Sequence, residues 1–432
     1  MTSLRVTGGR PLRGRLRVPG DKSISHRALL LAARAEGTSV LRGLSSGDDV
    51  SRTGAAIESL GAAIDRAPGT HGGGATTTVT GGVSLLHEPG GVIDVGNSGT
   101  TIRLLSGLVA AFDWRTELCG DASIATRPMD RVAKPLRLMG AQVAGREGGR
   151  FPPLIIDGGG LHGIDYTPPV ASAQAKSAVL LAGLGADGDT IIREPVPTRA
   201  HTEELLADCG ADIVVDAQAH TVRVRRSRLE PFELDVPGDP SQAAFWAVAA
   251  CIVPDSEIVI EDVYVGPART GFVAVLQRMG AAVEIDPTGP QRANIIARSS
   301  LDTLRGTEVA GDEIAGLIDE VPILAVAAAV ADGPTLFREV GELRVKESDR
   351  IDTMTRELSA LGATVREPGP GLMEVRRGPL AGATVRSHGD HRVAMSLAIA
   401  ALAAEGTTTI EGWDAVATSY PSFEDDLRAC WS

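Results

Sequence analysis

Aromatic side chains are scarce in this sequence. Phe, Trp and Tyr make up only 3% of its 432 residues, whereas glycine occurs 51 times. The core must therefore be built from Ala, Val, Leu and Ile with many tight turns, a balance that favours layered α/β architectures. Cysteine is also rare, and no C-x-x-C pair or zinc-like spacing is present, so we expect free, buried thiols. The four cysteines are Cys119, Cys209, Cys251 and Cys430.

An excess of positive charge and long apolar runs are missing as well. The formal net charge is −13, whereas a protein that binds a nucleic-acid backbone needs a basic face. The longest apolar run, residues 321–331, is too short to cross a bilayer, and residues 1–18 alternate like a strand and lack an apolar signal core. We therefore expect a cytoplasmic protein without nucleic-acid or membrane partners, although local positive charge would still suit small anionic substrates.

One five-residue pattern recurs five times at near-equal intervals. It consists of an apolar residue or Cys, then Gly-Ala, then any residue, and then a branched aliphatic residue. Each copy ends an amphipathic segment, and glycine suits a helix C-cap that needs a positive φ before a strand. A further helix-like segment, SFEDDLRACWS, lies at the C-terminal end. The pattern predicts six related helix-to-strand units, too large for common solenoid repeats. The recurring glycines are Gly61, Gly140, Gly210, Gly280 and Gly362.

The stretch PGDKSISHRALLLAA gathers two cations and two hydroxyls before an aliphatic helix. Ser23 or Ser25 is the predicted cap, with Arg27 four residues after Ser23. Because a helix N-terminus presents free N–H groups and a positive dipole end, Lys22 and Arg27 would complete a phosphate or carboxylate cradle. A P-loop is excluded because Asp21 separates the glycine from the lysine. A plain capped helix remains the alternative.

Further motifs place polar residues at predicted helix starts or in extended turns: GNSGTTIR, ATRPMDR, ASAQAKS, LIDEVP, LRVKESDR and SHGDHRVAMS. Capping, dipole complementation or a solvated, salt-bridged helix start explains each one in isolation. Repeated around a six-unit chain, they could instead converge on one cleft that focuses a multiply anionic substrate. A metal site at His388 and His391 is disfavoured because Arg392 would repel a cation.

Six motifs, in register over the entire chain, resemble the family of 5-enolpyruvylshikimate-3-phosphate (EPSP) synthases. They are PGDKSISHRALLLAA, GNSGTTIR, DASIATRPMDR, SAQAKSAVLLAGL, LRVKESDR and HGDHRVAMS. The resemblance implies a two-lobed, inside-out α/β barrel of six βαβαββ units, three per lobe. It also implies two crossings of the chain between the lobes and an active site in the cleft that closes on substrate.

The implied crossings define two domains. Residues 1–20 plus 239–432 form a discontinuous lobe that carries Asp319, Lys346, Arg350 and Arg392. Residues 21–238 form an inserted lobe that carries Lys22, Arg27, Arg127 and Gln174.

The resemblance implies transfer of the enolpyruvyl group of phosphoenolpyruvate to the 5-hydroxyl of shikimate 3-phosphate, with release of phosphate, on the shikimate pathway to chorismate and aromatic amino acids. Both substrates carry phosphate and carboxylate groups, which suits the local cations. The resemblance implies no metal or organic cofactor, and we expect a monomer. Two alternatives stay open: a UDP-N-acetylglucosamine enolpyruvyl transferase, and a noncatalytic anion-binding scaffold of the same fold.

Residue roles follow from the same resemblance. The implied shikimate 3-phosphate contacts are Lys22, Ser23, Arg27, Ser172, Gln174 and Arg199. The implied phosphoenolpyruvate pocket, where forked guanidiniums suit carboxylate and phosphate, comprises Lys22, Gly99, Arg127, Arg350 and Arg392. The implied catalytic residues are Asp319 as the base for the hydroxyl proton with Lys346 beside it, Glu347 for proton exchange at the methylene carbon, and Lys22.

Several positions depart from the family pattern. Ala173 stands where many members have a second serine, and Thr418 replaces a lysine of some relatives. Gly99 favours sensitivity to the herbicide glyphosate. Ala173 marks an alternative branch of the family, and this branch favours insensitivity. The UDP-N-acetylglucosamine enzymes normally carry a cysteine where this chain has Ala122, and Cys119 lies too early to replace it.

Overall fold

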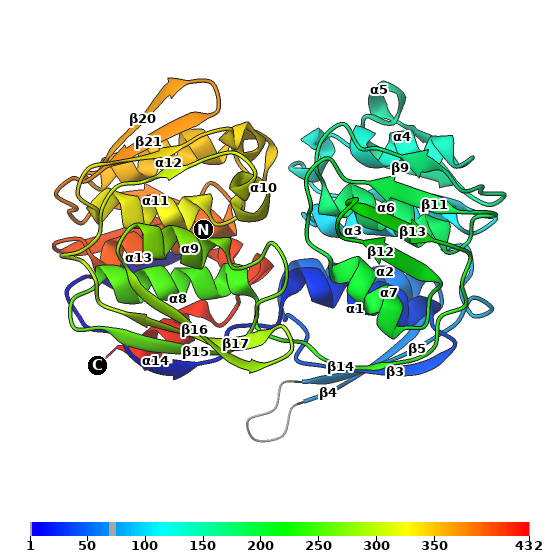
Figure 1. The fold of residues 1–432 in the computed structure, drawn as a ribbon, viewed down its shortest axis with the longest axis horizontal. Coiled ribbons are helices and arrows are strands. Elements are labelled where there is room, and N and C mark those ends of the chain that lie inside the picture. Colours follow the sequence, from blue (N-terminus) through cyan, green and yellow to red (C-terminus); the bar gives the residue numbers. More distant parts are fainter. Residues whose placement is uncertain (1, 69–74, 432) are drawn as a thin grey trace. The chain divides into compact units, whose positions relative to one another are not determined.

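The chain folds into two compact units, which are described separately (Figure 1). The computed structural model describes residues 2–68 and 75–431. The split lobe comprises Met1–Pro19 and Pro237–Ser432, and the inserted lobe comprises Gly20–Val236. The resemblance implied divisions after residues 20 and 238, whereas contact density divides the chain after Pro19 and Val236.

The described residues form six sheets, one for each repeat. Five of the sheets share one pattern of pairing: an edge strand pairs parallel with a second strand, which pairs antiparallel with a fourth, which pairs antiparallel with a third. In three of the modules these strands follow one another in the chain, with a helix after each of the first two; in the other two modules β14 or β2 is the edge strand. This βαβαββ module agrees with the expected fold. The sixth sheet has only three strands. In it, β1 (Ser3–Thr7) pairs antiparallel with β23 (Thr407–Glu411), and β23 pairs parallel with β22 (Thr384–Arg386).

The inserted lobe contains three modules. The first comprises α1 (Lys22–Arg34), β3 (Gly37–Arg42), α2 (Asp48–Ser59), β4 (Ala63–Ala67), β5 (Thr76–Gly81) and β14 (Glu233–Asp235). The second comprises β6 (Ile93–Asp94), α3 (Gly99–Ala110), β7 (Arg115–Cys119), η1 (Ile124–Thr126), α4 (Asp130–Leu138), β8 (Gln142–Gly145), α5 (Arg146–Gly149) and β9 (Phe151–Asp157). The third comprises β10 (Asp165–Tyr166), α6 (Ala173–Gly183), β11 (Thr190–Arg193), α7 (His201–Asp208), β12 (Ile213–Asp216) and β13 (Thr221–Val224).

The split lobe also contains three modules. The first comprises β2 (Arg13–Leu16), α8 (Pro240–Ile252), β15 (Glu257–Tyr264), α9 (Gly271–Arg278), β16 (Ala282–Gly289) and β17 (Arg292–Arg298). The second comprises β18 (Glu308–Val309), α10 (Glu313–Leu317), α11 (Val321–Val330), β19 (Pro334–Phe337), η2 (Val340–Val345), α12 (Arg350–Ala360), β20 (Thr364–Gly369) and β21 (Leu372–Arg376). The third comprises β22, α13 (His391–Leu402), β23, η3 (Trp413–Thr418), α14 (Phe423–Cys430) and β1.

Two short strands, β14 and β2, complete the sheets of modules from which they are far apart in sequence. β14, at the end of the inserted segment, pairs parallel with β3 near its beginning. β2, which precedes the inserted segment, pairs parallel with β15, which follows it. Each lobe therefore completes its first module with a strand far from the rest of that module in sequence.

The core of each lobe consists of helices. Every residue of α8, α11 and α13 is buried, as is nearly every residue of α1, α3 and α6. These helices are rich in Ala and Gly because neighbouring backbones approach closely: a Cβ added at Gly107 of α3 would lie 2.0 Å from the carbonyl oxygen of Ala178 on α6. The aliphatic core predicted from the scarcity of aromatic residues is confirmed.

The second helix of each complete module packs beside the outer strands, as α12 does against β20 and α9 against β16 (Figure 1). These helices bury one face and expose the other, which explains their amphipathic pattern. The five predicted glycine joints are confirmed because each glycine has a positive φ, from 77° to 111°, a conformation that strains other residues. The predicted C-terminal helix is α14.

Three further features bear on the sequence analysis. The N-cap of α1 is Asp21, whose side chain accepts from the Ile24 amide, so the prediction of Ser23 or Ser25 as the cap is wrong. The four cysteines are free; Cys119 is partly exposed and the other three are buried. Among the described residues, no helix combines the length and apolarity needed to cross a membrane.

Candidate active site

In five of the six modules a buried core helix begins at or beside predicted residues; α8 is the exception. In the inserted lobe, Lys22 is the first residue of α1, Gly99 is the first of α3, and Gln174 is the second of α6. In the split lobe, Asp319 lies just before α11, and Arg392 is the second residue of α13. Since a helix N-terminus carries a partial positive charge and free N–H groups, these ends are suited to bind anions.

A set of contacts connects α1, α2 and α3 of the inserted lobe near their starts. Lys22 of α1 forms an ion pair with Asp49 of α2. The hydroxyl of Thr101 on α3 donates to the backbone carbonyl of Asp49 at 3.4 Å. His26 of α1 and Thr53 of α2 are 2.6 Å apart between ring nitrogen and hydroxyl, and Thr53 in turn contacts Thr101 at 2.7 Å. These contacts hold Lys22 close to the start of α3.

Arg27 lies on the buried face of α1, only 3% exposed. Its Nε donates to the Thr202 hydroxyl at 2.7 Å, its Nη2 donates to the Ser177 hydroxyl at 2.7 Å, and its Nη1 donates to the backbone carbonyl of Ser23 at 2.9 Å. The guanidinium therefore joins α1 to α6 and α7. Four-residue spacing places it next to Ser23, as the sequence predicted.

Gly99 and Arg127 also lie together. Arg127 Nη2 donates to Asn97 Oδ1 at 2.8 Å and to the Ser123 hydroxyl at 3.1 Å. A Cβ added at Gly99 would lie 2.9 Å from Arg127 Nη1 and 3.1 Å from Arg103 Nη1, so any side chain there would displace a guanidinium. Glycine therefore keeps space for two arginines at the start of α3.

Gln174 is held at both ends of its amide. Arg103 Nη1 donates to Gln174 Oε1 at 2.7 Å, and Gln174 Nε2 donates to the Thr100 hydroxyl at 2.9 Å. Sequence reasoning missed Arg103 as a partner, although its position four residues after Gly99 in the GNSGTTIR motif places it on the same side of the helix. The start of α3 thus orients the start of α6.

The remaining candidates of the inserted lobe occupy two neighbouring segments. Ser172 is the predicted N-cap of α6, and this prediction is confirmed because its hydroxyl accepts from the Ala175 amide at 3.3 Å. Ala173, in place of the second serine, is the first residue of α6. Arg199 is partly buried in the segment that connects β11 to α7.

Arg350 organises the candidate residues of the split lobe. It is the first residue of α12 and only 1% exposed, so its motif is not a solvated helix start. Its Nε donates to Asp390 at 2.8 Å, its Nη2 to Glu347 at 2.5 Å and its Nη1 to Asp319 at 3.4 Å. Burial alone would lower the pKa of this guanidinium, but the three carboxylates raise it overall, so Arg350 stays charged.

Asp390 supports this arrangement from the start of α13. Its carboxylate accepts from the amides of Arg392 and Val393 and from Arg350. Burial favours its neutral form, yet Arg350 holds the pKa of Asp390 below its usual value. The sequence had indicated Asp390 only as a neighbour of two histidines, and its ion pair with a residue 40 positions away could not be read locally.

Asp319 is surrounded by cations. Its Oδ1 lies 3.6 Å from Lys346 Nζ and 3.4 Å from Arg350 Nη1, its Oδ2 lies 4.0 Å from Arg392 Nη2, and its backbone carbonyl accepts from Arg392 Nη1 at 3.0 Å. The side chain keeps 19% of its surface exposed. A carboxylate so placed can accept a proton from a bound hydroxyl while the cations bind anionic groups.

Each predicted site residue thus lies at one of two clusters. The inserted-lobe cluster contains Lys22, Ser23, Arg27, Gly99, Arg127, Ser172, Gln174 and, in a neighbouring segment, Arg199. The split-lobe cluster contains Asp319, Lys346, Glu347, Arg350 and Arg392. Thr418, at the end of η3, is partly buried. In the described part of the chain, no group of three or more His, Cys, Asp or Glu side chains is arranged to hold a metal ion.

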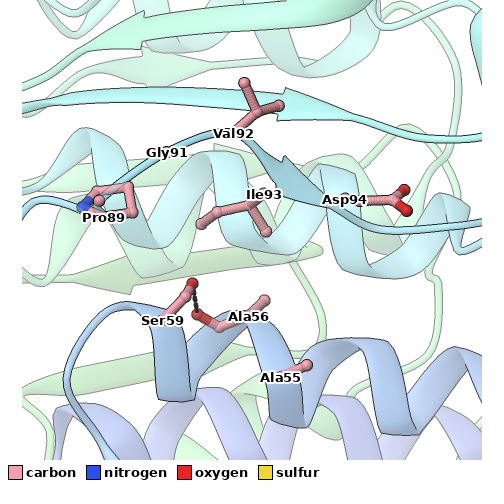
Figure 2. Close-up of a pocket in the computed structure, with 9 residues that line it drawn as sticks. Ala55, Ala56, Ser59, Pro89, Gly91, Val92, Ile93 and Asp94 are labelled. Atoms are coloured by element: carbon pink, nitrogen blue, oxygen red, sulfur yellow. Dashed lines mark hydrogen bonds between the residues drawn. The ribbon is translucent and has the colours of Figure 1, made fainter.

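A separate pocket of about 390 Å³ lies in the inserted lobe between α2 and the segment before α3 (Figure 2). Its lining is mostly backbone and small or apolar side chains, with Asp94 as its single titratable group. Figure 2 shows Ser59 and Ala56 on the helix facing Ile93 across this space. Without a cation in its lining, this pocket is unsuited to a multiply anionic ligand, which favours the charged clusters as the site.

Known proteins resemble this chain over nearly its full length. The sequence pattern of the EPSP synthase family (3-phosphoshikimate 1-carboxyvinyltransferase) matches residues 6–427. A 3-phosphoshikimate 1-carboxyvinyltransferase from Synechococcus sp. (strain JA-3-3Ab) is 50% identical over 433 residues, which cover 98% of this chain and 96% of that protein. The enzyme of the same name from Gloeobacter violaceus is 48% identical over 428 residues, which cover 98% of this chain and 97% of that protein.

Solved structures agree. An EPSP synthase from Acinetobacter baumannii superimposes with a TM-score of 0.84 and 38% identity, covering 99% of this chain and 98% of that one. The enolpyruvyl transferase NikO from Streptomyces tendae has a TM-score of 0.79 at 20% identity, covering 99% of this chain and 96% of that one, and supports the fold alone. With the family pattern matched from residue 6 to residue 427, the chain belongs to the EPSP synthase family.

Proposed function

We propose that the chain transfers the enolpyruvyl group of phosphoenolpyruvate to the 5-hydroxyl of shikimate 3-phosphate and releases phosphate. Membership of the EPSP synthase family, with 50% identity to an enzyme named 3-phosphoshikimate 1-carboxyvinyltransferase, carries this proposal. The chemistry of the two clusters supports it, because both are rich in cations at helix N-termini and both substrates are multiply anionic.

Each substrate has its own proposed contacts, and those of phosphoenolpyruvate come from both clusters. The shikimate 3-phosphate contacts are Lys22, Ser23, Arg27, Ser172, Gln174 and Arg199. The phosphoenolpyruvate contacts are Lys22, Gly99, Arg127, Arg350 and Arg392, with Lys346 beside the reacting groups. Arginine suits carboxylate and phosphate because its planar guanidinium donates two parallel hydrogen bonds.

Two carboxylates of the split-lobe cluster have the proposed proton-transfer roles. As the 5-oxygen of the acceptor bonds to C2 of phosphoenolpyruvate, Asp319 takes the hydroxyl proton and C3 gains a proton, giving a tetrahedral intermediate. The C2–O bond to phosphate then breaks, and C3 loses a proton, which regenerates the double bond. Glu347 exchanges the proton at C3, and Arg350 fixes Glu347 and Asp319 because it donates to both.

The proposal also includes the setting of the reaction: a monomer that uses no metal or organic cofactor and acts without nucleic-acid or membrane partners. The negative net charge supports the absence of a nucleic-acid partner. Sedimentation across a tenfold range of protein concentration tests the monomer, since a dimer would change its sedimentation coefficient over that range.

Two alternatives are less well supported. The UDP-N-acetylglucosamine reaction would lack the expected cysteine, because Ala122 occupies that position and Cys119 ends β7. Burial, Asp94 and Glu117 raise the pKa of the Cys119 thiol, which disfavours a reactive thiolate. A noncatalytic scaffold does not require a carboxylate such as Asp319 held among three cations.

One assay separates these functions. Phosphate release from phosphoenolpyruvate is measured with shikimate 3-phosphate, with UDP-N-acetylglucosamine and without an acceptor. Release that depends on shikimate 3-phosphate is expected. Release only with the sugar nucleotide would favour the sister reaction, and an Asp319→Ala variant with undiminished release would contradict the proposed base.

A further inference from the structure

Lys176 is a buried cation that the proposed chemistry does not use. It lies on α6 two residues after Gln174, and its side chain is 1% exposed. Its Nζ is 2.9 Å from Glu194 Oε2 and 2.5 Å from Glu203 Oε1, and these two side chains are 9% and 4% exposed. The lysine therefore joins α6 to the end of β11 and to the first turn of α7.

The two carboxylates enclose the segment that carries Arg199. Glu194 immediately follows β11, and Glu203 lies two residues after the start of α7. Inside this segment the Thr198 hydroxyl donates to Glu194 Oε1 at 2.5 Å, beside Arg199 in sequence. The segment of residues 194–203 is thus fixed to α6 at both ends through a single ammonium group.

The adjacent residue pair forms a second connection between the same two helices. Ser177 and Thr202 are 2.6 Å apart between their hydroxyl oxygens, and Arg27 donates to both of them at 2.7 Å. Lys176–Glu203 and Ser177–Thr202 therefore lie side by side between α6 and α7. A shift of α7 after loss of the lysine would move the hydroxyl that holds Arg27.

The arrangement depends on charge as well as shape. Two cations, Lys176 and Arg27, accompany two carboxylates, Glu194 and Glu203, in this buried region. Burial raises the pKa of Glu203, although Lys176 opposes that effect. Removal of the ammonium would leave two buried carboxylates without its charge, so the 194–203 segment would move towards water.

Arg127 is held by different contacts, with Asn97 and Ser123. Loss of Lys176 therefore acts on Arg27 and Arg199 rather than on Arg127.

We propose that Lys176 is a positioning residue for the acceptor substrate: through Glu194 and Glu203 it sets the places of Arg199 and Arg27, which bind the anionic groups of that substrate. The inference rests on the proposed function, and it adds a residue that touches neither substrate. It predicts that the lysine controls affinity for the acceptor and leaves affinity for phosphoenolpyruvate unchanged.

The test compares Lys176→Met with the wild type. The KM for shikimate 3-phosphate is expected to rise about tenfold or more, with the KM for phosphoenolpyruvate changed less than about twofold. Lys134→Met is the matched control, because Lys134 is an exposed lysine of α4 in the same lobe, and it should alter neither KM. Equal changes in both KM values, or no change in either, would overturn the proposal.

Two further variants keep the test decisive if Lys176→Met folds poorly. Thr198→Val removes only the hydroxyl that joins the segment to Glu194, and should raise the KM for shikimate 3-phosphate alone by about threefold. Lys176→Met combined with Glu194→Gln and Glu203→Gln removes all three charges. A positioning role predicts that this triple variant regains thermal stability but not acceptor affinity, whereas recovery of both would indicate a purely structural lysine.

The wild type separates this inference from the proposed function. A wild type that turns over shikimate 3-phosphate but whose variants show no selective KM change would overturn the inference alone. A wild type without such turnover would overturn the proposed function and this inference with it.

Discussion

The two lobes use the same module but place different chemistry at the ends of their core helices. In the inserted lobe, Arg27 and Arg127 are held mainly by hydroxyl, amide and carbonyl oxygens. In the split lobe, Arg350 is held by three carboxylates. Hydroxyl partners leave the cationic character of a guanidinium intact, whereas carboxylates neutralise it. The comparison favours the proposal that the inserted lobe mainly binds anions, whereas the split lobe adds proton transfer to anion binding.

The difference begins at equivalent positions. The sequence VPGD occurs before α1 and again before α8, and in both places the aspartate caps the helix: Asp21 accepts from Ile24 and Asp239 from Ser241. The next residue is Lys22 in the inserted lobe but Pro240 in the split lobe. The same backbone start therefore presents a cation in one lobe and only a helix end in the other.

The largest expected effect comes from removing the proposed base of the split lobe. Asp319→Asn keeps the size of the side chain but cannot accept the hydroxyl proton, so kcat should fall about 10²- to 10⁴-fold. Steady-state kinetics with both substrates measure this change. Asp312→Asn, at an exposed position before α10, is the control and should retain kcat. Full activity of the Asp319 variant would break the proposed division between the lobes.

The next effect concerns the buried carboxylate of the same cluster. Asp390→Asn removes the charge of the most deeply buried of the three carboxylates that hold Arg350, and should lower the free energy of unfolding at pH 7 by about 3–5 kcal/mol. Because the folded-state pKa of Asp390 lies below its unfolded value, its stabilisation is present above about pH 4 and disappears as pH falls further. Denaturant unfolding at several pH values should show the difference between variant and wild type shrinking in acid.

The control for this prediction is Asp352→Asn, which breaks an exposed ion pair with Arg356. Its effect should be below about 1 kcal/mol. Equal effects of the two substitutions would show that burial of the Arg350 pair is not what stabilises the cluster.

A smaller effect is expected from the inserted lobe. Arg127→Lys keeps the charge but loses the forked donor geometry, so the KM for phosphoenolpyruvate should rise about 10- to 100-fold. The KM for shikimate 3-phosphate should stay nearly constant. Arg115→Lys, at an exposed position at the start of β7, is the matched control. A fall in kcat without a rise in KM would contradict the assignment of this lobe to binding.

The smallest effect is a difference in pH dependence. Burial, with help from Lys22 and Arg27, lowers the pKa of His26 well below its usual value. The unfolded chain therefore binds a proton more readily, and stability should fall by up to about 1.4 kcal/mol per pH unit below about pH 6.5. His26→Gln should flatten this slope in denaturant titrations between pH 7 and pH 5.

Exposed His87 provides the comparison, and His87→Gln should keep the wild-type slope. An unchanged slope in the His26 variant would show that protonation of His26 does not cause the loss of stability in acid.

Local patterns predicted much of the fold. Five glycines with helical spacing before them identified the modules, since a C-cap and a following strand are decided by neighbouring residues. Local reasoning failed at the start of α1, where Asp21 was considered only as an interruption of a P-loop although it is the cap. The predicted cap was therefore displaced by two residues or more.

The sequence predicted which residues belong to the site, but not which of their side chains contact one another. The burial of Arg350 depends on Asp390, and the orientation of Gln174 depends on Arg103, 71 residues earlier. Such pairs come from tertiary packing of separate modules, which leaves no local periodicity to read. The catalytic and binding roles of the predicted residues stay predictions for the kinetic experiments.

The strands that complete modules from a distance in sequence set an order of assembly during synthesis. β14 lies at the end of the inserted segment, so all strands of that lobe have emerged from the ribosome once residue 235 has cleared the exit tunnel. β2 emerges early but must await β15, and β1 must await β23 near the end of the chain. The nascent chain can therefore complete the inserted lobe first, while the lobe that carries the proposed acid–base groups closes only when translation is almost finished.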